Sequence, residues 1–214
     1  MPIDTFQHKG LRKRLCEELR EKGISDEAVL AAIEKIPRHF FLESTFDTIA
    51  YEDRALPILC DQTISQPSTV AFQTQLLKIK RGEKIMEIGT GSGYQTSVLC
   101  ELGAQVFSVE RHKGLFDKAK LHLAELRYNA KTFLGDGYKG LPAYAPFDKV
   151  IITCGAPEVP QAIIEQMKIG AMMVIPVGDK IQEMRLITKL SDTELKTETF
   201  GNFRFVPMLE KRKF

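Results

Sequence analysis

Glu87-Ile-Gly-Thr-Gly-Ser-Gly-Tyr94 decides the fold, because it places three glycines at alternate positions directly after a short apolar run. Gly89, Gly91 and Gly93 lack a Cβ, so this backbone can take positive φ and let a ligand approach its N–H groups. Residues 83–88 before the turn are typical of a strand, and residues 94–102 after it are typical of the start of a helix. This context predicts a cofactor-binding turn.

The spacing of the glycines separates this turn from two other nucleotide-binding motifs. A dinucleotide fingerprint, G-x-G-x-x-G, would place its third glycine at position 94, which is Tyr94. A P-loop would continue into Gly-Lys-Ser or Gly-Lys-Thr, which does not follow here. An acidic residue two places before G-x-G-x-G resembles the first motif of the Rossmann-like S-adenosylmethionine-dependent methyltransferases. We expect Glu87 to attract the cationic amino-acid end of that cofactor; the alternative is a tight turn that binds no ligand.

Strands and helices alternate from residue 70 onward. The predicted strands are residues 84–88, 104–110, 130–134, 147–153 and 170–178, and the predicted helices are residues 70–78, 94–102, 113–126 and 159–167. This succession predicts an α/β fold with a mostly parallel, doubly wound sheet, as in the Rossmann-like methyltransferases. In such folds the ligand lies at the carboxyl ends of the strands.

Carboxylates follow two of the predicted strands. Glu110 ends the second strand, 17 residues after Gly93, where ribose hydroxyls arrive in nucleotide-binding folds of this type. Gly135-Asp-Gly137 closes the third strand and could place Asp136 near an adenine amino group. The sequence therefore predicts that Glu110, Asp136 and Gly137 bind the nucleoside part of the cofactor.

The two ends of the chain differ from this alternating core. Residues 9–22 predict an amphipathic helix, and Ser25 is the predicted N-cap of a second helix that ends before Pro37. Residues 184–190 and 200–206 alternate like strands and predict an antiparallel edge. We expect a single methyltransferase domain, residues 1–214. Its parts are an N-terminal helical layer with a substrate loop (1–71), a cofactor-binding core (72–180) and C-terminal strands (181–214).

Composition limits the possible partners. A net charge of +2 over 214 residues gives no general electrostatic footprint for nucleic acid, and no stretch predicts export or membrane insertion. Cys16, Cys60, Cys100 and Cys154 are widely separated and are predicted to be reduced core thiols of a cytoplasmic protein. The four histidines show no metal-ligand spacing, so we expect no metal. Nothing indicates an obligate assembly, and we expect a monomer.

Asp61-Gln-Thr-Ile-Ser-Gln-Pro-Ser68 carries hydrogen-bonding side chains at most of its positions and lies directly before a predicted helix. Its hydroxyls and amides could hold a polar group of a substrate. The structural alternative is a helix N-terminus capped by Ser65 or Ser68, with Pro67 in the first turn. The residues alone favour the cap.

Over nearly its whole length the chain resembles the protein-L-isoaspartate O-methyltransferases, a family of protein-repair carboxyl methyltransferases. The glycine turn alone indicates only a methyltransferase, whereas Gln62-Thr-Ile-Ser-Gln-Pro67 narrows the substrate. Other segments carry the resemblance: Ile36-Pro-Arg-His-Phe-Phe41, Ala50-Tyr-Glu-Asp53, Ala55-Leu-Pro-Ile58, Val109-Glu-Arg111, Gly135-Asp-Gly137, Gly155-Ala-Pro-Glu-Val-Pro160, Ile175-Pro-Val-Gly178 and Arg204-Phe-Val-Pro207. Ser68 departs from the family, because many relatives carry an aromatic residue there, which affects the expected shape of the substrate entrance.

The resemblance implies methyl transfer from S-adenosyl-L-methionine to the free α-carboxylate of an L-isoaspartyl residue in an aged peptide, with S-adenosyl-L-homocysteine as product. The ester then cyclises to a succinimide, whose opening returns some normal aspartate. By resemblance, Ser65 is the catalytic residue that positions the carboxylate, and Val206 contacts the peptide backbone. The implied cofactor-binding residues are Thr63, Ile64, Glu87, Gly89, Gly91, Gly93, Glu110, Asp136 and Gly137.

Two other kinds of protein remain as alternatives. A methyltransferase for a small metabolite or nucleic acid would keep the glycine turn and Glu110, but it would have no reason to keep residues 62–67. A binding protein without catalysis would keep the fold while Ser65 failed to engage a substrate. Labelled cofactor and an isoaspartyl peptide separate these alternatives.

Overall fold

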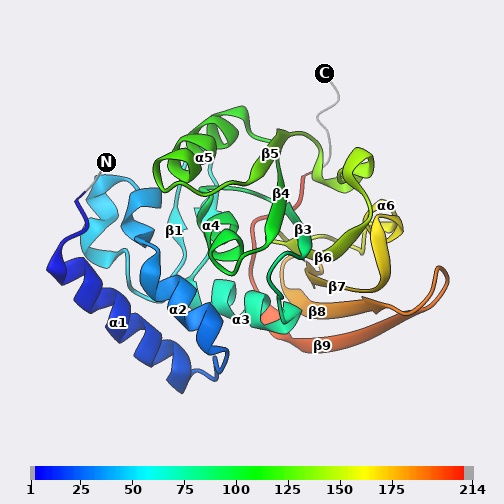
Figure 1. The fold of residues 1–214 in the computed structure, drawn as a ribbon, viewed down its shortest axis with the longest axis horizontal. Helices are drawn as coiled ribbons and strands as arrows, with labels where there is room; N and C mark the ends of the chain where they lie inside the picture. Colours follow the sequence, from blue (N-terminus) through cyan, green and yellow to red (C-terminus); the bar gives the residue numbers. More distant parts are fainter. Residues whose placement is uncertain (1–2, 210–214) are drawn as a thin grey trace.

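The computed structural model describes residues 3–209, and its centre is a seven-stranded sheet (Figure 1). The strands are β3 (Lys84–Ile88), β4 (Gln105–Glu110), β5 (Lys131–Leu134), β6 (Phe147–Ile152), β7 (Met167–Val177), β8 (Gln182–Lys189) and β9 (Leu195–Phe203). They lie in the order β5-β4-β3-β6-β7-β8-β9. Strands β3 to β7 pair in parallel, and β8 and β9 add an antiparallel edge. The predicted mostly parallel sheet and its antiparallel edge are confirmed.

Helices cover both faces of the sheet, because successive side chains of each strand point to opposite faces. On one face, Ile85 and Val106 pack with Leu77 of α3 (Pro67–Leu77) and Leu99 of α4 (Tyr94–Glu101). On the other face, Met86 packs in a cluster with residues of α6 and of the short turns before β6. The remaining core helices and 3₁₀ turns are α5 (Lys113–Glu125), α6 (Gln161–Glu165), η3 (Gly137–Lys139) and η4 (Pro142–Tyr144). This doubly wound arrangement leaves the carboxyl ends of the central strands for a ligand.

An N-terminal layer packs beside the sheet, next to α3 and α4 (Figure 1). Its elements are α1 (Phe6–Glu21), α2 (Glu27–Lys35), η1 (Arg38–Phe41), η2 (Ser44–Ile49) and the two-residue strands β1 (Leu56–Pro57) and β2 (Thr63–Ile64). The apolar stripe of α2 enters one buried cluster with Tyr94 and Val98 of α4. The layer therefore shares a core with the helix that follows the glycine turn.

The helix starts in this layer differ from the prediction. Helix α1 begins at Phe6, where Thr5 accepts from the N–H of His8 in a capping box. Helix α2 is capped by Asp26, which accepts from the N–H groups of Ala28 and Val29, so the prediction that Ser25 is the cap was wrong. Either residue type can cap a helix, and the pattern of apolar residues does not separate neighbouring positions.

The cysteines do not form the uniform set that composition predicted. Cys16 is buried, whereas Cys60 is exposed and Cys100 and Cys154 are half-buried, so the expectation of four core thiols was wrong for Cys60. Cys60 lies at φ +61° in the turn between β1 and β2, outside the apolar clusters. No helix within residues 3–209 is long and apolar enough to cross a membrane.

Candidate active site

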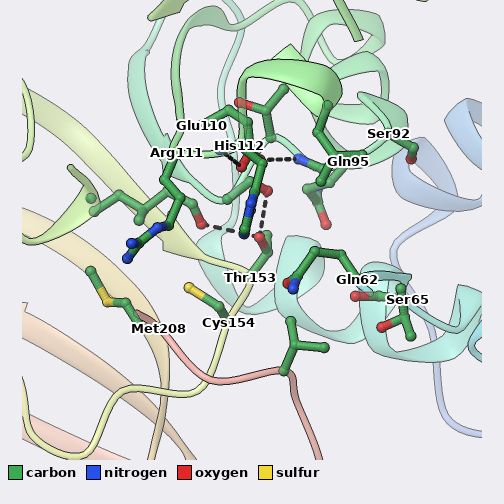
Figure 2. Close-up of a pocket in the computed structure, with 18 of the residues that line it drawn as sticks. Gln62, Ser65, Ser92, Gln95, Glu110, Arg111, His112, Thr153, Cys154 and Met208 are labelled. Carbon is green, nitrogen blue, oxygen red and sulfur yellow. Dashed lines mark hydrogen bonds between the residues drawn. The ribbon is translucent and has the colours of Figure 1, made fainter. Parts of the chain in front are cut away.

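A cavity opens at the carboxyl ends of β3, β4 and β6 (Figure 2). Residues that follow β4 and β6 line it, together with three other segments. They are the turn after β3, which we call the glycine turn (residues 89–93), the substrate loop (residues 62–67) and the C-terminal segment (residues 206–209). In Figure 2, Gln62 and Ser65 lie across the cavity from Glu110 and Arg111. The cavity therefore has one wall made of the glycine turn and the strand ends, and another that carries hydroxyl and amide groups.

The glycine turn has the conformation that its sequence predicted. Gly89, Gly91 and Gly93 take φ values of +95°, +56° and +91°. A Cβ on Gly89 would lie 2.5 Å from Thr153 Oγ1, and that hydroxyl donates to the carbonyl of Gly89 at 2.6 Å. Gly89 and Gly91 line the cavity, whereas Gly93 caps α4 and packs against Ala119. Close approach thus requires glycine at position 89, and helix geometry requires it at position 93.

Glu110 lines the cavity at the end of β4. One carboxylate oxygen accepts from the N–H of Gly91 and the other from the N–H of His112, both at 2.8 Å (Figure 2). Each carboxylate oxygen has two lone pairs, so Glu110 can still accept from two further hydroxyl donors. The side chain therefore holds the glycine turn to the end of β4 while it faces the cavity.

Glu87 has a different place from the one we expected. Its side chain is fully buried beneath the glycine turn and does not line the cavity. Thr96 Oγ1 donates to one carboxyl oxygen at 2.5 Å, and the other oxygen has no partner among the described residues. Burial raises the pKa of Glu87 to about 7, against the lowering effect of the nearby Ser108 and Thr96 hydroxyls. Direct attraction of a charged cofactor end by Glu87 is therefore not supported, because strand alternation turns this side chain away from the ligand.

The turn after β5 contributes its backbone and not its carboxylate. Gly137 lines the cavity, and a Cβ there would lie 2.5 Å from Ile88 Cγ2. Asp136 is outside the lining, and its Oδ1 accepts from the N–H of Tyr138 as the cap of η3. A second oxygen of Asp136 stays available to a ligand. The expected contact with an adenine amino group stays a prediction.

The substrate loop brings Thr63, Ile64 and Ser65 to the cavity. The N-cap of α3 is Gln66, Pro67 is in the first turn, and no side chain caps the helix. The cap that the residues alone favoured at Ser65 or Ser68 was therefore wrong. Among the described residues, Ser65 Oγ has no hydrogen-bond partner, whereas Ser68 Oγ accepts from Gln66 Nε2. The Ser65 hydroxyl is free to bind a ligand.

Val206 lies beside the carboxyl end of β6 and lines the cavity. The N–H of Gly155 donates to the carbonyl of Val206 at 2.8 Å, and the N–H of Met208 donates to the carbonyl of Gly155 at 2.7 Å. This short pairing holds residues 206–208 beside the end of β6. Val206 and Ser65 also line a smaller adjoining cavity together with Arg204, which extends the site away from the glycine turn.

Sequence reasoning missed several residues that line the cavity. Arg111 and His112 follow β4, and Thr153 and Cys154 follow β6. The rule that ligands bind beyond the carboxyl ends of parallel strands could have found all four of them. Met208 carried no such signal, because it comes from an irregular segment after the last strand.

A second polar cluster lies in the N-terminal layer, away from the cavity. The rings of His8 and His39 stack with centroids 3.9 Å apart, although composition indicated scattered histidines. Arg12 binds both oxygens of Asp4 at 2.7 and 2.9 Å. Asp4, His8 and His39 lie close enough for a metal, but His8 Nδ1 accepts from the N–H of Thr5, His39 Nδ1 is hydrogen-bonded to the Tyr51 hydroxyl, and Arg12 binds the carboxylate. This cluster is a hydrogen-bonded part of the layer.

Comparison with known proteins agrees with this geometry. The model of the family described as Protein-L-isoaspartate(D-aspartate) O-methyltransferase matches residues 10–213. Proteins named protein-L-isoaspartate O-methyltransferase from Christiangramia forsetii and Flavobacterium psychrophilum are 55% and 56% identical over 210 residues. Each alignment covers 98% of this chain and 99% of the relative. The resemblance that the sequence motifs indicated is therefore confirmed.

Solved structures of similar proteins have the same fold as this chain. A structure named protein-L-isoaspartate O-methyltransferase aligns with a TM-score of 0.85 and 30% identity, covering 92% of this chain and 65% of that one. A Plasmodium falciparum structure of the same description, in complex with S-adenosyl-L-homocysteine, aligns at 0.82 and 22% identity, covering 94% and 99%. The Rossmann-like methyltransferase fold is thus confirmed. By its family model and by relatives more than half identical over its length, the chain belongs to the protein-L-isoaspartate O-methyltransferase family.

Proposed function

We propose that this protein transfers a methyl group from S-adenosyl-L-methionine to the free α-carboxylate of L-isoaspartyl residues in damaged peptides and proteins. The methyl ester then closes to a succinimide, and its opening returns some L-aspartyl residue. Family membership supports the reaction, and the cavity supports the assignment of roles. Methylation of a small metabolite is the weaker candidate, because it would not need the substrate loop.

The residues of the glycine-turn wall fit a single nucleoside with a charged amino-acid tail. Gly89 and Gly91 offer backbone that a ligand can approach closely, at the N-terminus of α4. Glu110 presents a carboxylate with free lone pairs at the end of β4. Thr63 and Ile64 line the opposite side, and Gly137 leaves room beside Ile88. We assign cofactor binding to these residues, with Asp136 as a further candidate through its free oxygen.

For methyl transfer, the protein has to align the reacting atoms and to remove water from the two charged reactants. When bound, S-adenosylmethionine supplies a methyl group that is attached to a positively charged sulfur. S-adenosylhomocysteine, which contains this sulfur, is a good leaving group. The substrate carboxylate is already a nucleophile, so no side chain has to remove a proton from it. We assign to Ser65 Oγ a hydrogen bond that orients this carboxylate, and to Val206 a contact with the peptide backbone. Holding the reacting atoms in line supplies the main part of the acceleration.

One observation carries the proposal. The free hydroxyl of Ser65 and the backbone of the glycine turn line the same cavity. A group bound at Ser65 and a nucleoside bound at Glu110 would therefore meet within one site. A capped helix start at Ser65 would have used its hydroxyl in the fold, and no such bond is present among the described residues.

The test compares two peptides that differ only in one linkage. Purified protein is incubated with methyl-labelled S-adenosylmethionine and a peptide containing L-isoaspartate, or with the same peptide containing normal L-aspartate. We expect label in the first peptide alone. Equal labelling of both peptides would contradict the substrate assignment. Labelling of neither, while S-adenosylhomocysteine binds in calorimetry, would favour a small-metabolite substrate.

The proposal extends to the setting of the enzyme. We expect it to act in the cytoplasm as a monomer, without metal, nucleic acid or membrane as partners. We also expect residues 1–214 to behave as one methyltransferase domain. A single sedimenting species at the mass of one chain would support the monomer.

A further inference from the structure

Arg38 is the most deeply buried cation of the N-terminal layer, and the mechanism above does not use it. Its side chain is 0% exposed at the start of η1. Nη1 donates to the carbonyl of Ala50 at 2.5 Å, and Nη2 donates to the carbonyls of Arg54 and Ser65 at 3.1 and 3.2 Å. One guanidinium therefore connects η1, the segment before β1 and the substrate loop.

All of these partners are neutral carbonyls. No carboxylate within residues 3–209 forms an ion pair with Arg38, and its Nε has no partner there. Asp53 is near enough to influence the charge, but Asp53 binds Lys22 Nζ and the N–H of Ser68. Burial lowers the pKa of Arg38, yet an arginine remains charged in proteins. The layer thus contains a positive charge that no ion pair neutralises.

Burial of such a charge costs free energy, because the ion loses its hydration. Only a nearby opposite charge or well-formed hydrogen bonds offset this loss. Arg12 is a second buried guanidinium in the same layer, and its partners differ from those of Arg38. It is 4% exposed, binds both oxygens of Asp4, and donates to the carbonyl of Glu34 at 2.7 Å. Arg12 is therefore neutralised within the fold, and Arg38 is not.

Arg38 lies close to residues that line the cavity. It reaches Ser65 through the loop carbonyl, and its guanidinium carbon lies 5.8 Å from the centre of the Tyr94 ring. Ser65 belongs to the substrate loop and Tyr94 is the first residue of α4, after the glycine turn; both line the cavity. Arg38 thus lies behind the junction of the two walls.

We propose that Arg38 is a positioning residue for the methyl transfer. It fixes the main chain at Ser65, so that the hydroxyl meets the substrate carboxylate, and its unpaired charge favours binding of that anion at the junction of the walls. This inference rests on the proposed function, since it requires a substrate with a free carboxylate. Lysine could keep the charge but could not hold three carbonyls, because it lacks the planar fork of donors.

The test uses Arg38→Lys and Arg38→Met, with Arg12→Lys as the matched control. Each is assayed with the isoaspartyl peptide at saturating S-adenosylmethionine, and S-adenosylhomocysteine binding is measured by calorimetry. For Arg38→Met we expect the KM for peptide to rise about tenfold or more, since an interaction with a charged group is lost. For Arg38→Lys we expect a smaller rise in KM together with a fall in kcat of several-fold. The cofactor dissociation constant should stay within about twofold for both.

Arg12→Lys should lower the melting temperature and leave the peptide KM within about twofold of the wild type. The inference is wrong if the Arg38 variants keep the wild-type peptide KM and kcat, or if they weaken cofactor and peptide equally. A wild-type protein that does not label the peptide would instead contradict the proposed function, and the inference with it.

A measurement on the wild-type protein tests the inference even if the Arg38 variants fail to fold. The Nε–H signal of Arg38 is followed by NMR in the presence of S-adenosylhomocysteine. Added isoaspartyl peptide should shift this signal, and the aspartyl peptide should not. An unmoved signal at saturating isoaspartyl peptide would overturn the inference.

Discussion

The two walls of the cavity are built in different ways. The glycine turn follows β3, which pairs with β4 and β6 on either side, so its position is fixed by backbone in the middle of the sheet. The substrate loop contains the two-residue strand β2. Side chains of other segments hold it: Arg38 at the Ser65 carbonyl, and Asp53 at the N–H of Ser68, directly after the loop. The cofactor wall therefore depends on backbone conformation, whereas the peptide wall depends on side-chain anchors. Changes in the glycine turn should leave the peptide KM nearly unaffected, and a change at Ser65 should leave cofactor affinity nearly unaffected.

The largest effect is expected for Gly89→Ala in the backbone-built wall. The new Cβ would lie 2.5 Å from Thr153 Oγ1 at φ +95°. Strain and overlap together should cost roughly 3 kcal/mol of unfolding free energy and abolish tight cofactor binding. Denaturant unfolding and calorimetry with S-adenosylhomocysteine measure the two effects. Gly91→Ala is the control, because a Cβ there meets nothing closer than 3.8 Å, so its cost should be about 1 kcal/mol. Equal costs at both positions would show that close approach at Gly89 does not matter.

Glu110→Gln tests the same wall through a side chain. An amide can accept through only one oxygen, so it loses one of the two backbone donors and the charge that favours ribose hydroxyls. We expect cofactor binding to weaken by about 1.5 to 3 kcal/mol, while the peptide KM at saturating cofactor stays unchanged. Isothermal titration and initial rates give the two constants. An unaltered cofactor affinity would remove Glu110 from the ribose site.

Ser65→Ala tests the other wall. Its hydroxyl caps no helix, so we expect an unchanged melting temperature and unchanged cofactor affinity. Loss of one hydrogen bond to a carboxylate should lower kcat/KM for the isoaspartyl peptide about tenfold to a hundredfold. Ser68→Ala is the matched control, because Ser68 lines neither cavity. Initial rates at several peptide concentrations test the role of Ser65. Normal kinetics in Ser65→Ala would show that Ser65 has no catalytic role.

The smallest effect concerns Glu87, which lies under the glycine turn. Because burial raises the pKa of Glu87 to about 7, the folded protein keeps this proton while the unfolded chain releases it above about 4.5. The stabilisation is present below the unfolded pKa and is lost as pH rises through 7. Between pH 6 and 8 the wild type should lose roughly 1 kcal/mol of unfolding free energy relative to Glu87→Gln. Denaturant unfolding of both proteins at a series of pH values measures the difference, and parallel curves would contradict the assigned pKa.

The same contrast explains what the sequence could predict. The glycine turn and strands β3 to β7 were predictable, because spacing and periodicity are local and each strand determines its own backbone. Glu110 was predictable for the same reason, as a carboxylate at the end of a strand. Glu87 was misplaced because strand alternation decides its direction, and the fully buried strand shows no alternating polarity from which to read it.

The peptide wall could not be predicted in this way. The guanidinium of Arg38 meets Ser65 across 27 positions in the chain, and no local pattern reports such a contact. The resemblance to a family supplied Ser65 and Val206, whereas local rules favoured a helix cap that the structure lacks. Side-chain anchors between distant segments depend on the complete fold, so residues such as Arg38 emerge only from coordinates.

The pairing of residues 206–208 with Gly155 has a consequence for damaged copies of the enzyme itself. A protease that cut the chain after Phe203 would leave every strand of the sheet in the chain. It would nevertheless lack Val206 and Met208, which close one side of the cavity. Such a clipped copy would fold around an open site and could not exclude water from two charged reactants. Loss of residues 204–214 would therefore slow methyl transfer although every strand of the sheet remains.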